Sequence, residues 1–438
     1  MAPSVRLLPN VVEIQETLHA LLYRSYGLRL EHFIVEDGHT RMACWVPASH
    51  GKPAYDDGDD HNDAGDDGDS VASPATASER RSSGRKPPLL LIHGFGASSL
   101  NHWIKQIPVL SRHFELYIPS LVYFFSSTSA SAKRRGEFFQ AEAMLGLMDA
   151  LGIERCQVVG LSYGGIVAYR MATLSPSRVA RLAVAGSGVM MNRAEYDALI
   201  ARWGVDSTVP LFLPRTPAEL LRLIGMAHRE TPYLPEWILQ DAVDRFFENR
   251  EEKAQLLEDL CEQRVHGDAH YPVPTMETLI VWGEDDAVFP ISIGYRMHNT
   301  CPTLRFHPPT IPIRPTPLPS HFPSLAPCAR PAPCARCCFP FHRHFGPCSR
   351  LEVFEKGSHA LQADDTARFN HTILTFLLHG NSPTHARSSS PPAAAAVDAA
   401  PAAISPGLLS AGVVAVAAGA AALAAGAVAA ISAATVVQ

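Results

Sequence analysis

The segment "VVGLSYGGIV", residues Val158 to Val167, has the pattern of a buried strand that turns into a helix through a glycine-rich turn. Its centre, Gly160-Leu161-Ser162-Tyr163-Gly164, matches G-x-S-x-G. Between a strand and a helix this pattern builds a tight, strained turn that exposes the serine, and the glycines let neighbouring segments approach. Ser162 is therefore predicted to be a nucleophile, with Gly160 and Gly164 as the glycines of its turn.

A serine at its ordinary pKa is a poor nucleophile, so a base and an orienting acid are expected elsewhere in the chain. His359 is the predicted base, because "EKGSHALQ" places it in a loop just after an apolar strand. The acid is expected in "IVWGEDDAVFP", where a strand ends in Glu284, Asp285 and Asp286.

Hydrogen-bond donors for an oxyanion are predicted at two places. The amide of Tyr163 would open the helix after Ser162, where the helix dipole favours negative charge. The second donor is expected in "HGFG", which follows the strand Leu89 to Ile92. There the backbone amide of Phe95, between Gly94 and Gly96, is the main candidate.

The remaining pattern predicts the fold. From residue 87, continuous apolar strands alternate with helical segments, which is typical of a parallel sheet buried on both faces. Residues 190–272 are almost entirely helical, and strand patterning resumes at "METLIVWGEDD". We therefore predict a doubly wound, mostly parallel α/β sheet with a helical cap inserted between two strands, above the edge where sites form.

At these residues the chain resembles the α/β-hydrolase superfamily, and more closely the capped serine hydrolases of plants and bacteria that are similar to monoacylglycerol lipases and meta-cleavage-product hydrolases. Residues 139–172 and "WGEDDAVFP" carry the resemblance. It implies an eight-stranded sheet, an acyl-enzyme and no cofactor. The loop G-x-x-D-x-x-x-P points to Asp286 as the acid, with Asp285 as the alternative, and the order Ser162, Asp286, His359 fits this architecture.

Two regions bear on the substrate. Where relatives usually have an acidic residue and a glycine turn, this chain has "SLVYFFSSTSA", so Ser120, Phe124 and Phe125 are expected to border the pocket. The cap offers apolar side chains that either face the pocket or pack between helices: Trp203, Leu211, Phe212, Leu213, Leu221 and Met226. An apolar cap without an evident arginine clamp favours esters with hydrophobic acyl groups.

Composition divides the chain further. We expect the following segments: 1–50, N-terminal helix and first hairpin; 51–85, acidic disordered loop; 86–189, core with nucleophile; 190–272, cap; 273–301, core with acid loop; 302–350, Pro/Cys-rich insertion; 351–380, core with His359; 381–406, linker; 407–438, Ala-rich apolar tail. The insertion is either a disordered loop or translated non-coding sequence. Its Cys334-x-x-Cys337 lacks a second pair at zinc-finger spacing, so no metal site is predicted.

The two ends of the chain bear on location. Leu7, Leu8, Val11, Ile14, Leu18, Leu21 and Leu22 form an apolar stripe interrupted by glutamates, which indicates an amphipathic helix rather than a signal peptide and a chain on the cytoplasmic side. The tail 407–438 has no charged residue over 32 positions, so it is either a membrane anchor or an alanine-rich low-complexity segment. A net charge of −6 argues against nucleic acid as a partner.

The leading hypothesis is therefore a serine esterase or lipase-like hydrolase that acts on a small-molecule ester. Two alternatives stay open. One is a hydrolase of carbon-carbon bonds of the meta-cleavage type, which uses the same triad. The other is a small-molecule hormone receptor that retains the triad and signals through movement of the cap.

Overall fold

The computed structural model describes residues 10–35, 38–51, 85–96, 98–131, 135–265, 271–300 and 349–381. The expected acidic loop, most of the Pro/Cys-rich insertion, the linker and the apolar tail lie outside these ranges, as do Leu7 and Leu8. Within the described residues, no helix combines the length and the apolar character needed to cross a membrane.

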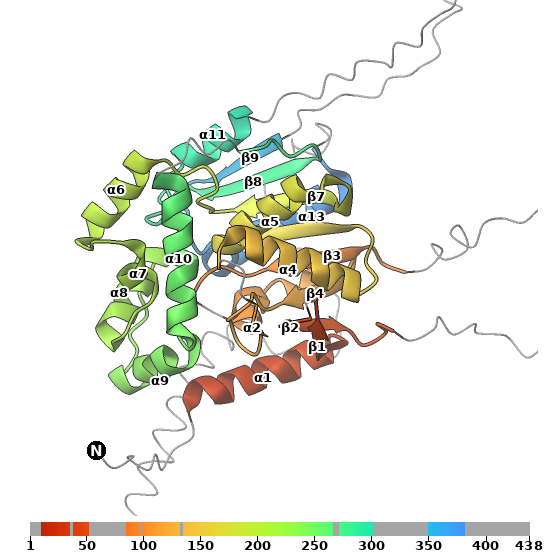
Figure 1. The fold of residues 1–438 in the computed structure, drawn as a ribbon, viewed down its shortest axis with the longest axis horizontal. Helices are drawn as coiled ribbons and strands as arrows, with labels where there is room; N and C mark the ends of the chain where they lie inside the picture. The colour runs from red at the N-terminus through yellow and green to blue at the C-terminus, as the bar shows by residue number, and fades with distance from the viewer. Residues whose placement is uncertain are drawn as a thin grey trace, which may run out of the picture.

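The core of the described chain is one mostly parallel sheet (Figure 1). Its strands run in the order β1-β2-β4-β3-β6-β7-β8-β9, and the short strand β5 pairs with β2. β1 and β2 are antiparallel to their neighbours, β5 included, and the strands β4, β3, β6, β7, β8 and β9 are parallel. The predicted doubly wound α/β class is thus confirmed. The strands are β1 (Leu28–Ile34), β2 (Thr40–Pro47), β3 (Pro88–Ile92), β4 (Glu115–Pro119), β5 (Thr128–Ser129), β6 (Cys156–Leu161), β7 (Val179–Ala185), β8 (Thr278–Gly283) and β9 (Ser349–Phe354).

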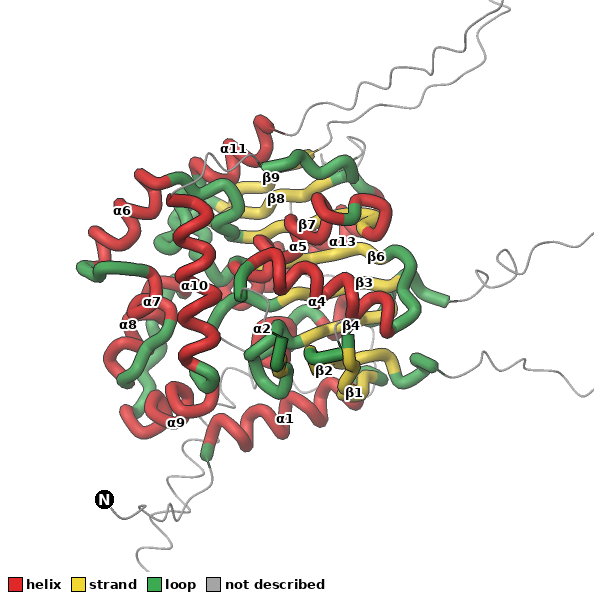
Figure 2. The backbone as a smooth tube through the Cα atoms, in the orientation of Figure 1, coloured by secondary structure: helices red, strands yellow, loops and turns green. Residues whose placement is uncertain are grey.

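Helices cover both faces of the sheet, as Figure 2 shows. On one face α4 (Glu137–Ala150), α5 (Tyr163–Leu174) and α11 (Ser292–Thr300) share a core with Val158 of β6. On the other face the core contains Val159 of the same strand. This alternation follows from the two-residue period of a strand. The helices of the second face are α1 (Val11–Ser25), α2 (Ser99–Trp103), α3 (Ile107–Leu110), α12 (Leu361–Asp364) and α13 (Thr366–His379), and a 3-10 turn, η2 (Pro176–Arg178), precedes β7.

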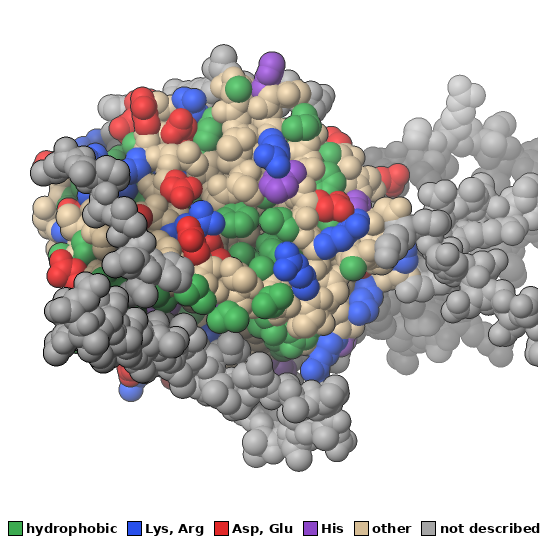
Figure 3. Space-filling model, turned by 90° about the horizontal axis from the view of Figure 1, so that it is seen from below, with side chains coloured by type: hydrophobic (Ala, Val, Ile, Leu, Met, Phe, Trp, Pro, Cys, Tyr) green, Lys and Arg blue, Asp and Glu red, His purple; other side chains and the backbone are tan. Residues whose placement is uncertain are grey.

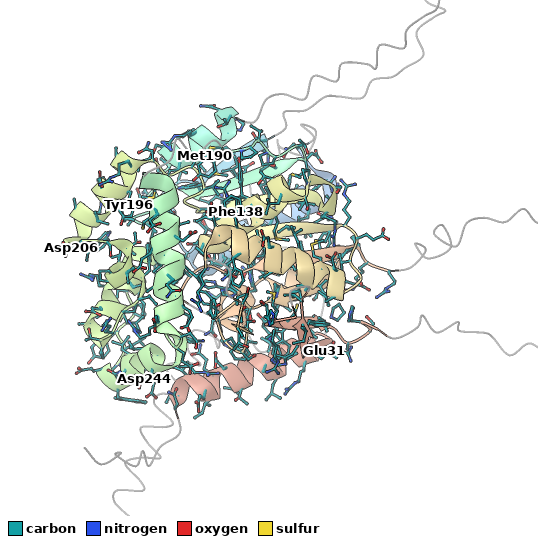
Figure 4. The ribbon with its side chains drawn as sticks, in the orientation of Figure 1. Glu31, Phe138, Met190, Tyr196, Asp206 and Asp244 are labelled. Carbon is teal, nitrogen blue, oxygen red and sulfur yellow. The ribbon has the colours of Figure 1, made fainter. Side chains whose placement is uncertain are left out.

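The cap lies between β7 and β8 in the chain and stands beside the carboxyl ends of the strands (Figure 1). Its helices have clear start signals: Asn192 and Glu195 form a capping box at α6, and Thr216 accepts the Glu219 amide at α8. Tyr196 of α6 lies toward α10 (Figure 4), and burial raises its pKa to about 12. The cap helices are α6 (Arg193–Trp203), α7 (Thr208–Phe212), α8 (Pro217–Ala227), α9 (Glu236–Phe246) and α10 (Arg250–Val265).

Three local expectations differ from the structure. The helical segment expected between the strands now seen as β3 and β4 is two short helices, because Pro108 has no amide hydrogen to continue the first. β9 begins at Ser349 rather than after Arg350, since these residues continue the pairing with β8. The apolar stripe of α1 does not all face the core: Leu18 and Leu21 are 49% and 53% exposed.

The buried side of α1 instead carries Val12, Glu16 and Tyr23. The Glu16 carboxylate accepts a hydrogen bond from Arg245 Nε of α9 at 2.8 Å. The Tyr23 hydroxyl donates to the carbonyl of Ser99 at 2.9 Å. These polar contacts turn the helix so that part of its leucine stripe faces solvent. Figure 3 shows this side of the molecule, where hydrophobic side chains come to the surface between acidic and basic groups.

Candidate active site

Ser162 stands at the turn between β6 and α5, with φ 55° and ψ −119°, a conformation that a residue with a side chain rarely adopts. Four hydrogen bonds hold this backbone. The Ser162 amide donates to the carbonyl of Ala185 at 2.9 Å. The Ser162 carbonyl accepts from the amides of Gly165 and Ile166 at 3.0 and 3.3 Å and from Ser187 Oγ at 2.8 Å. The surrounding fold therefore fixes the strained turn that G-x-S-x-G predicts.

The two glycines of the turn leave room for close backbone packing. A Cβ on Gly164 would overlap the carbonyls of Ile92 and His93, at the end of β3. A Cβ on Gly160 would overlap the carbonyl of Gly164 itself. A side chain at Gly164 would push the turn away from the strand that precedes the "HGFG" loop, and one at Gly160 would push strand β6 away from the start of α5.

Asp286 and His359 lie on loops that follow the neighbouring strands β8 and β9. His359 Nδ1 and Asp286 Oδ2 are hydrogen-bonded at 2.8 Å, and the Asp286 side chain is fully buried. Asp286 Oδ1 accepts the amides of Val288 and Phe289 at 2.8 and 2.9 Å. The second acid considered, Asp285, is exposed. The structure thus brings Asp286, and not Asp285, to the histidine.

The loop that carries Gly94, Phe95 and Gly96 is held by the buried His93 and the half-buried His102. The Gly94 amide donates to His102 Nδ1 at 2.9 Å, and His93 Nε2 accepts the Leu121 amide at 3.0 Å. A ring nitrogen can accept a hydrogen bond only when it carries no proton, so both imidazoles must be neutral. Burial lowers the pKa of His93 to about 4 and that of His102 to about 3, so both are neutral at neutral pH.

A cavity of about 570 Å³ connects the predicted site residues. Ser162, Tyr163, Phe95, Gly96 and His359 all line it, and Asp286 lies behind His359. Its remaining wall is largely apolar, from the cap: Phe212, Leu220, Leu223, Ile224, Leu239 and Ala242. Val12 and Gln15 of α1 line it as well. A small molecule in this cavity would therefore lie against Ser162, the histidine and apolar cap side chains at once.

One expectation about the pocket needs correction, and one open alternative is decided residue by residue. Ser120, Phe124 and Phe125 do not line the cavity; Ser120 and Phe124 are buried behind the "HGFG" loop, where Phe124 packs on His93. Of the six apolar cap residues considered, Phe212 lines the cavity. Others are used for packing between helices instead: Leu211, Leu213 and Met226 are each at most 3% exposed.

Comparison with known proteins identifies the family. The sequence model described as "alpha/beta hydrolase fold" matches residues 87–310, about half of the chain. The chain belongs to this family. The match contains the Ser162 turn and the Asp286 loop, whereas His359 lies beyond its end.

Individual relatives agree with this assignment. The hydrolase is 30% identical to a 2-hydroxy-6-oxononadienedioate/2-hydroxy-6-oxononatrienedioate hydrolase of a Pseudomonas species, over 50% of this chain and 78% of that protein. Two solved structures share the fold: a membrane phospholipase A described as a bacterial virulence factor (TM-score 0.56, 18% identity, 84% and 92% covered) and a 2-hydroxy-6-oxo-6-phenylhexa-2,4-dienoate hydrolase from Rhodococcus sp. strain RHA1 (TM-score 0.51, 17% identity, 80% and 99% covered).

Sequence patterns alone did not point to three residues of the hydrolase's site. His102 orders the "HGFG" loop. Gly186, at φ 46°, lies so close to the acid-base pair that a Cβ there would be 3.2 Å from Asp286 Oδ2 and 3.3 Å from His359 Nδ1. Asp364 of α12 accepts hydrogen bonds from His228 Nδ1 and from Ser358, the neighbour of His359, at 2.8 and 2.6 Å. Only Gly186 leaves a local signal, as a glycine directly after a buried strand.

Proposed function

We propose that this protein is a serine hydrolase of carboxylic esters with apolar acyl groups. The observation that carries the proposal is the buried 2.8 Å hydrogen bond between Asp286 and His359, with His359 lining the same cavity as the strained Ser162. An acid that orients a histidine beside an exposed serine is the arrangement that activates a hydroxyl for attack.

In the proposed reaction, Ser162 Oγ attacks the ester carbonyl carbon while His359 Nε2 takes its proton. The negative charge on the carbonyl oxygen is stabilised by the amides of Phe95 and Tyr163. His359 then gives the proton to the leaving alcohol, which breaks the ester bond and leaves an acyl group on Ser162. Water, activated by the same histidine, releases the acid. Asp286 keeps the imidazole in the tautomer with a proton on Nδ1 and stabilises its cationic form.

The charge of the cavity wall supports an uncharged substrate. Among the described residues that line it, the ionised groups are Lys105, Glu230 and Asp364, with no arginine. The Lys105 ammonium already donates to the Ala363 carbonyl at 2.9 Å. A buried carboxylate is stable only when paired, ideally with a guanidinium that binds both of its oxygens. This wall therefore favours a neutral ester over an acid.

The second candidate is hydrolysis of a carbon-carbon bond, since the Pseudomonas relative is named for a dienedioate and is 30% identical over 78% of its length. The same serine and histidine would serve that reaction. The difference lies in the substrate, because a dienedioate carries two carboxylates for which the described cavity wall offers only Lys105.

The test is a parallel assay of the full-length protein with p-nitrophenyl esters of increasing chain length and with a 2-hydroxy-6-oxo-dienoate. Ester hydrolysis that disappears in Ser162→Ala but persists in the control Ser177→Ala, an exposed serine, would support the proposal. Ester turnover that survives Ser162→Ala would overturn it. Preferential cleavage of the dienoate would assign the second candidate instead.

A further inference from the structure

The segment Leu121 to Ser127 contains two non-glycine residues with positive φ, Tyr123 at 72° and Phe125 at 53°. We refer to Tyr123, Phe124 and Phe125 as the aromatic turn. Such conformations are unfavourable for aromatic residues and persist where surrounding contacts impose them. The contacts around this turn therefore need an explanation beyond the path of the chain.

Each ring of the aromatic turn lies beneath one cation. The Arg135 guanidinium is 5.3 Å from the centre of the Tyr123 ring, the Lys253 ammonium 4.7 Å from that of Phe124, and the Arg245 guanidinium 5.6 Å from that of Phe125. These distances are in the range of cation-π attraction. Lys253 and Arg245 belong to the cap helices α10 and α9. Two charged side chains of the cap thus contact the aromatic turn.

Lys253 is the most buried of these cations, at 1% exposure. Its ammonium donates to the carbonyl of Phe246 at 2.9 Å and otherwise faces the Phe124 ring. Burial lowers the pKa of Lys253 to about 8, so it keeps most of its charge at neutral pH. A desolvated ammonium gains more from an aromatic face than an exposed one does. The Lys253–Phe124 contact is therefore a strong link between cap and core.

Phe124 also contacts the "HGFG" loop. Its ring centre is 5.3 Å from that of His93 and 5.1 Å from that of Phe95, and the Phe95 ring is 5.6 Å from the ring of Tyr163. All three pairs meet edge to face, which is a favoured geometry. Phe124 therefore contacts both a cap cation and Phe95, and Phe95 in turn contacts Tyr163. The amides of Phe95 and Tyr163 are the two that would bind the oxyanion.

We propose that Phe124, held by Lys253, is a positioning residue for the oxyanion-binding amides, so that correct seating of the cap is required for stabilisation of the transition state. The inference rests on the proposed ester hydrolysis. It assigns a role to the aromatic turn, which replaces the acidic residue and glycine turn expected at this place.

The test compares four variants of the full-length protein. Lys253→Met removes the charge and keeps the stem, and Phe124→Leu removes the aromatic face; Lys253→Arg and Phe124→Tyr restore them. We expect kcat for a p-nitrophenyl ester to fall roughly tenfold in the first two, less than the loss of a whole oxyanion donor, with KM changed less than twofold. The two conservative variants should stay near the wild-type kcat.

A trifluoromethyl ketone, which forms an oxyanion adduct with an active serine, provides the second readout. Its affinity should weaken by the same factor as kcat/KM in Lys253→Met and Phe124→Leu, because both quantities report binding of the oxyanion. The matched control is Arg368→Met, which removes a cation-π pair of similar kind between α13 and Phe354 and should change neither quantity. Thermal unfolding identifies any variant that is not folded. If Lys253→Met does not fold, the comparison of Phe124→Leu with Phe124→Tyr decides, and the reverse holds if Phe124→Leu does not fold.

The outcomes separate the two proposals. An active wild type with unchanged kcat in Lys253→Met and Phe124→Leu, or a raised KM with unchanged analogue affinity, would overturn the positioning role alone. A wild type without Ser162-dependent ester turnover would overturn the proposed function and this inference with it.

Discussion

The Asp364 carboxylate accepts a hydrogen bond from His228 Nδ1 at 2.8 Å, across the boundary between the core helix α12 and the end of the cap helix α8. The same carboxylate accepts the Arg229 amide at 2.8 Å. Burial alone would raise its pKa, but these bonds and that from Ser358 lower it to about 2. Asp364 is thus ionised under ordinary conditions and joins the cap to the loop of His359.

Replacement of Asp364 should weaken this junction. Asp364→Ala leaves three donors without their acceptor, which typically costs about 1 to 3 kcal/mol. We expect the free energy of unfolding in urea to fall by that amount and kcat to fall with it, because Ser358 adjoins the predicted base. Asp206→Ala, an exposed acid on the cap, is the control. Equal stability of the two variants would show that the junction contributes nothing.

The identity of the acid can be tested with neighbouring residues. Asp286→Asn should lower kcat by about 10³-fold to 10⁴-fold, because the amide no longer stabilises the imidazolium or selects its tautomer. Asp285→Asn should stay within about twofold, because Asp285 is exposed and its neighbour holds the histidine. Steady-state ester kinetics on both variants would settle the assignment, and a larger loss in Asp285→Asn would reverse it.

The backbone of Ser162 predicts an unusual stability effect. At φ 55° a glycine is less strained than any residue with a Cβ. Ser162→Gly should therefore be more stable than Ser162→Ala by about 1 kcal/mol, although glycine normally destabilises folded chains relative to alanine. Urea unfolding of the two inactive variants measures the difference. If alanine proved the more stable, the turn would not be strained.

His93 and His102 predict that stability falls in mild acid. Their pKa values are lower in the folded protein than the usual value near 6.5, at about 4 and 3. Below pH 6.5 the unfolded chain therefore binds protons that the folded chain does not, and stability decreases as the pH falls toward 4. Each histidine adds at most about 1.4 kcal/mol per pH unit. His102→Gln should reduce the dependence of the unfolding free energy on pH by the amount that corresponds to the uptake of up to one proton. Urea unfolding between pH 7 and 4 measures this dependence, and an unchanged dependence would contradict the assignment.

The size of the cavity should limit the acyl chain. Ala242 of α9 lines it with a small side chain. Ala242→Trp should therefore suppress hydrolysis of long-chain esters by at least about tenfold, while acetate esters remain good substrates, because one methylene in an apolar pocket already changes transition-state binding by about 1 kcal/mol or more. Leu18→Trp on the exposed side of α1 should leave the chain-length profile unchanged. The same profile in both variants would place the acyl group elsewhere.

The sequence predicted those parts of the site whose requirements lie within a few neighbouring residues. The turn around Ser162 has its glycines within two residues of the serine, because the contacts that demand them are backbone contacts at the turn. The doubly wound sheet was predicted because continuous apolar strands are themselves the consequence of burial on both faces. His359 and the acidic run that contains Asp286 could be located since each follows a strand, and parallel strands bring their ends to one edge. The choice of Asp286 over Asp285 came from the resemblance to the family's acid loop.

The parts that were missed depend on contacts between distant segments. His102 and Gly94 are eight residues apart, yet only the fold shows which ring nitrogen faces which amide. Lys253 lies more than 120 residues from Phe124, and a lysine in a charged helical segment has the pattern of a solvent-exposed side chain. Glu16 was counted as an interruption in the apolar stripe of α1, whereas its contact with Arg245 sets which side of that helix is buried.

The place of α1 has a practical consequence for anyone who produces shortened forms of the protein. The family match begins at residue 87, and a recombinant fragment cut there would lack Val12 and Gln15, and with them one wall of the cavity, together with strands β1 and β2. A fragment cut at residue 310 would lack His359. The smallest fragment worth expressing therefore runs from before Asn10 to beyond Asn381, and an affinity tag is best separated from Asn10 by a spacer.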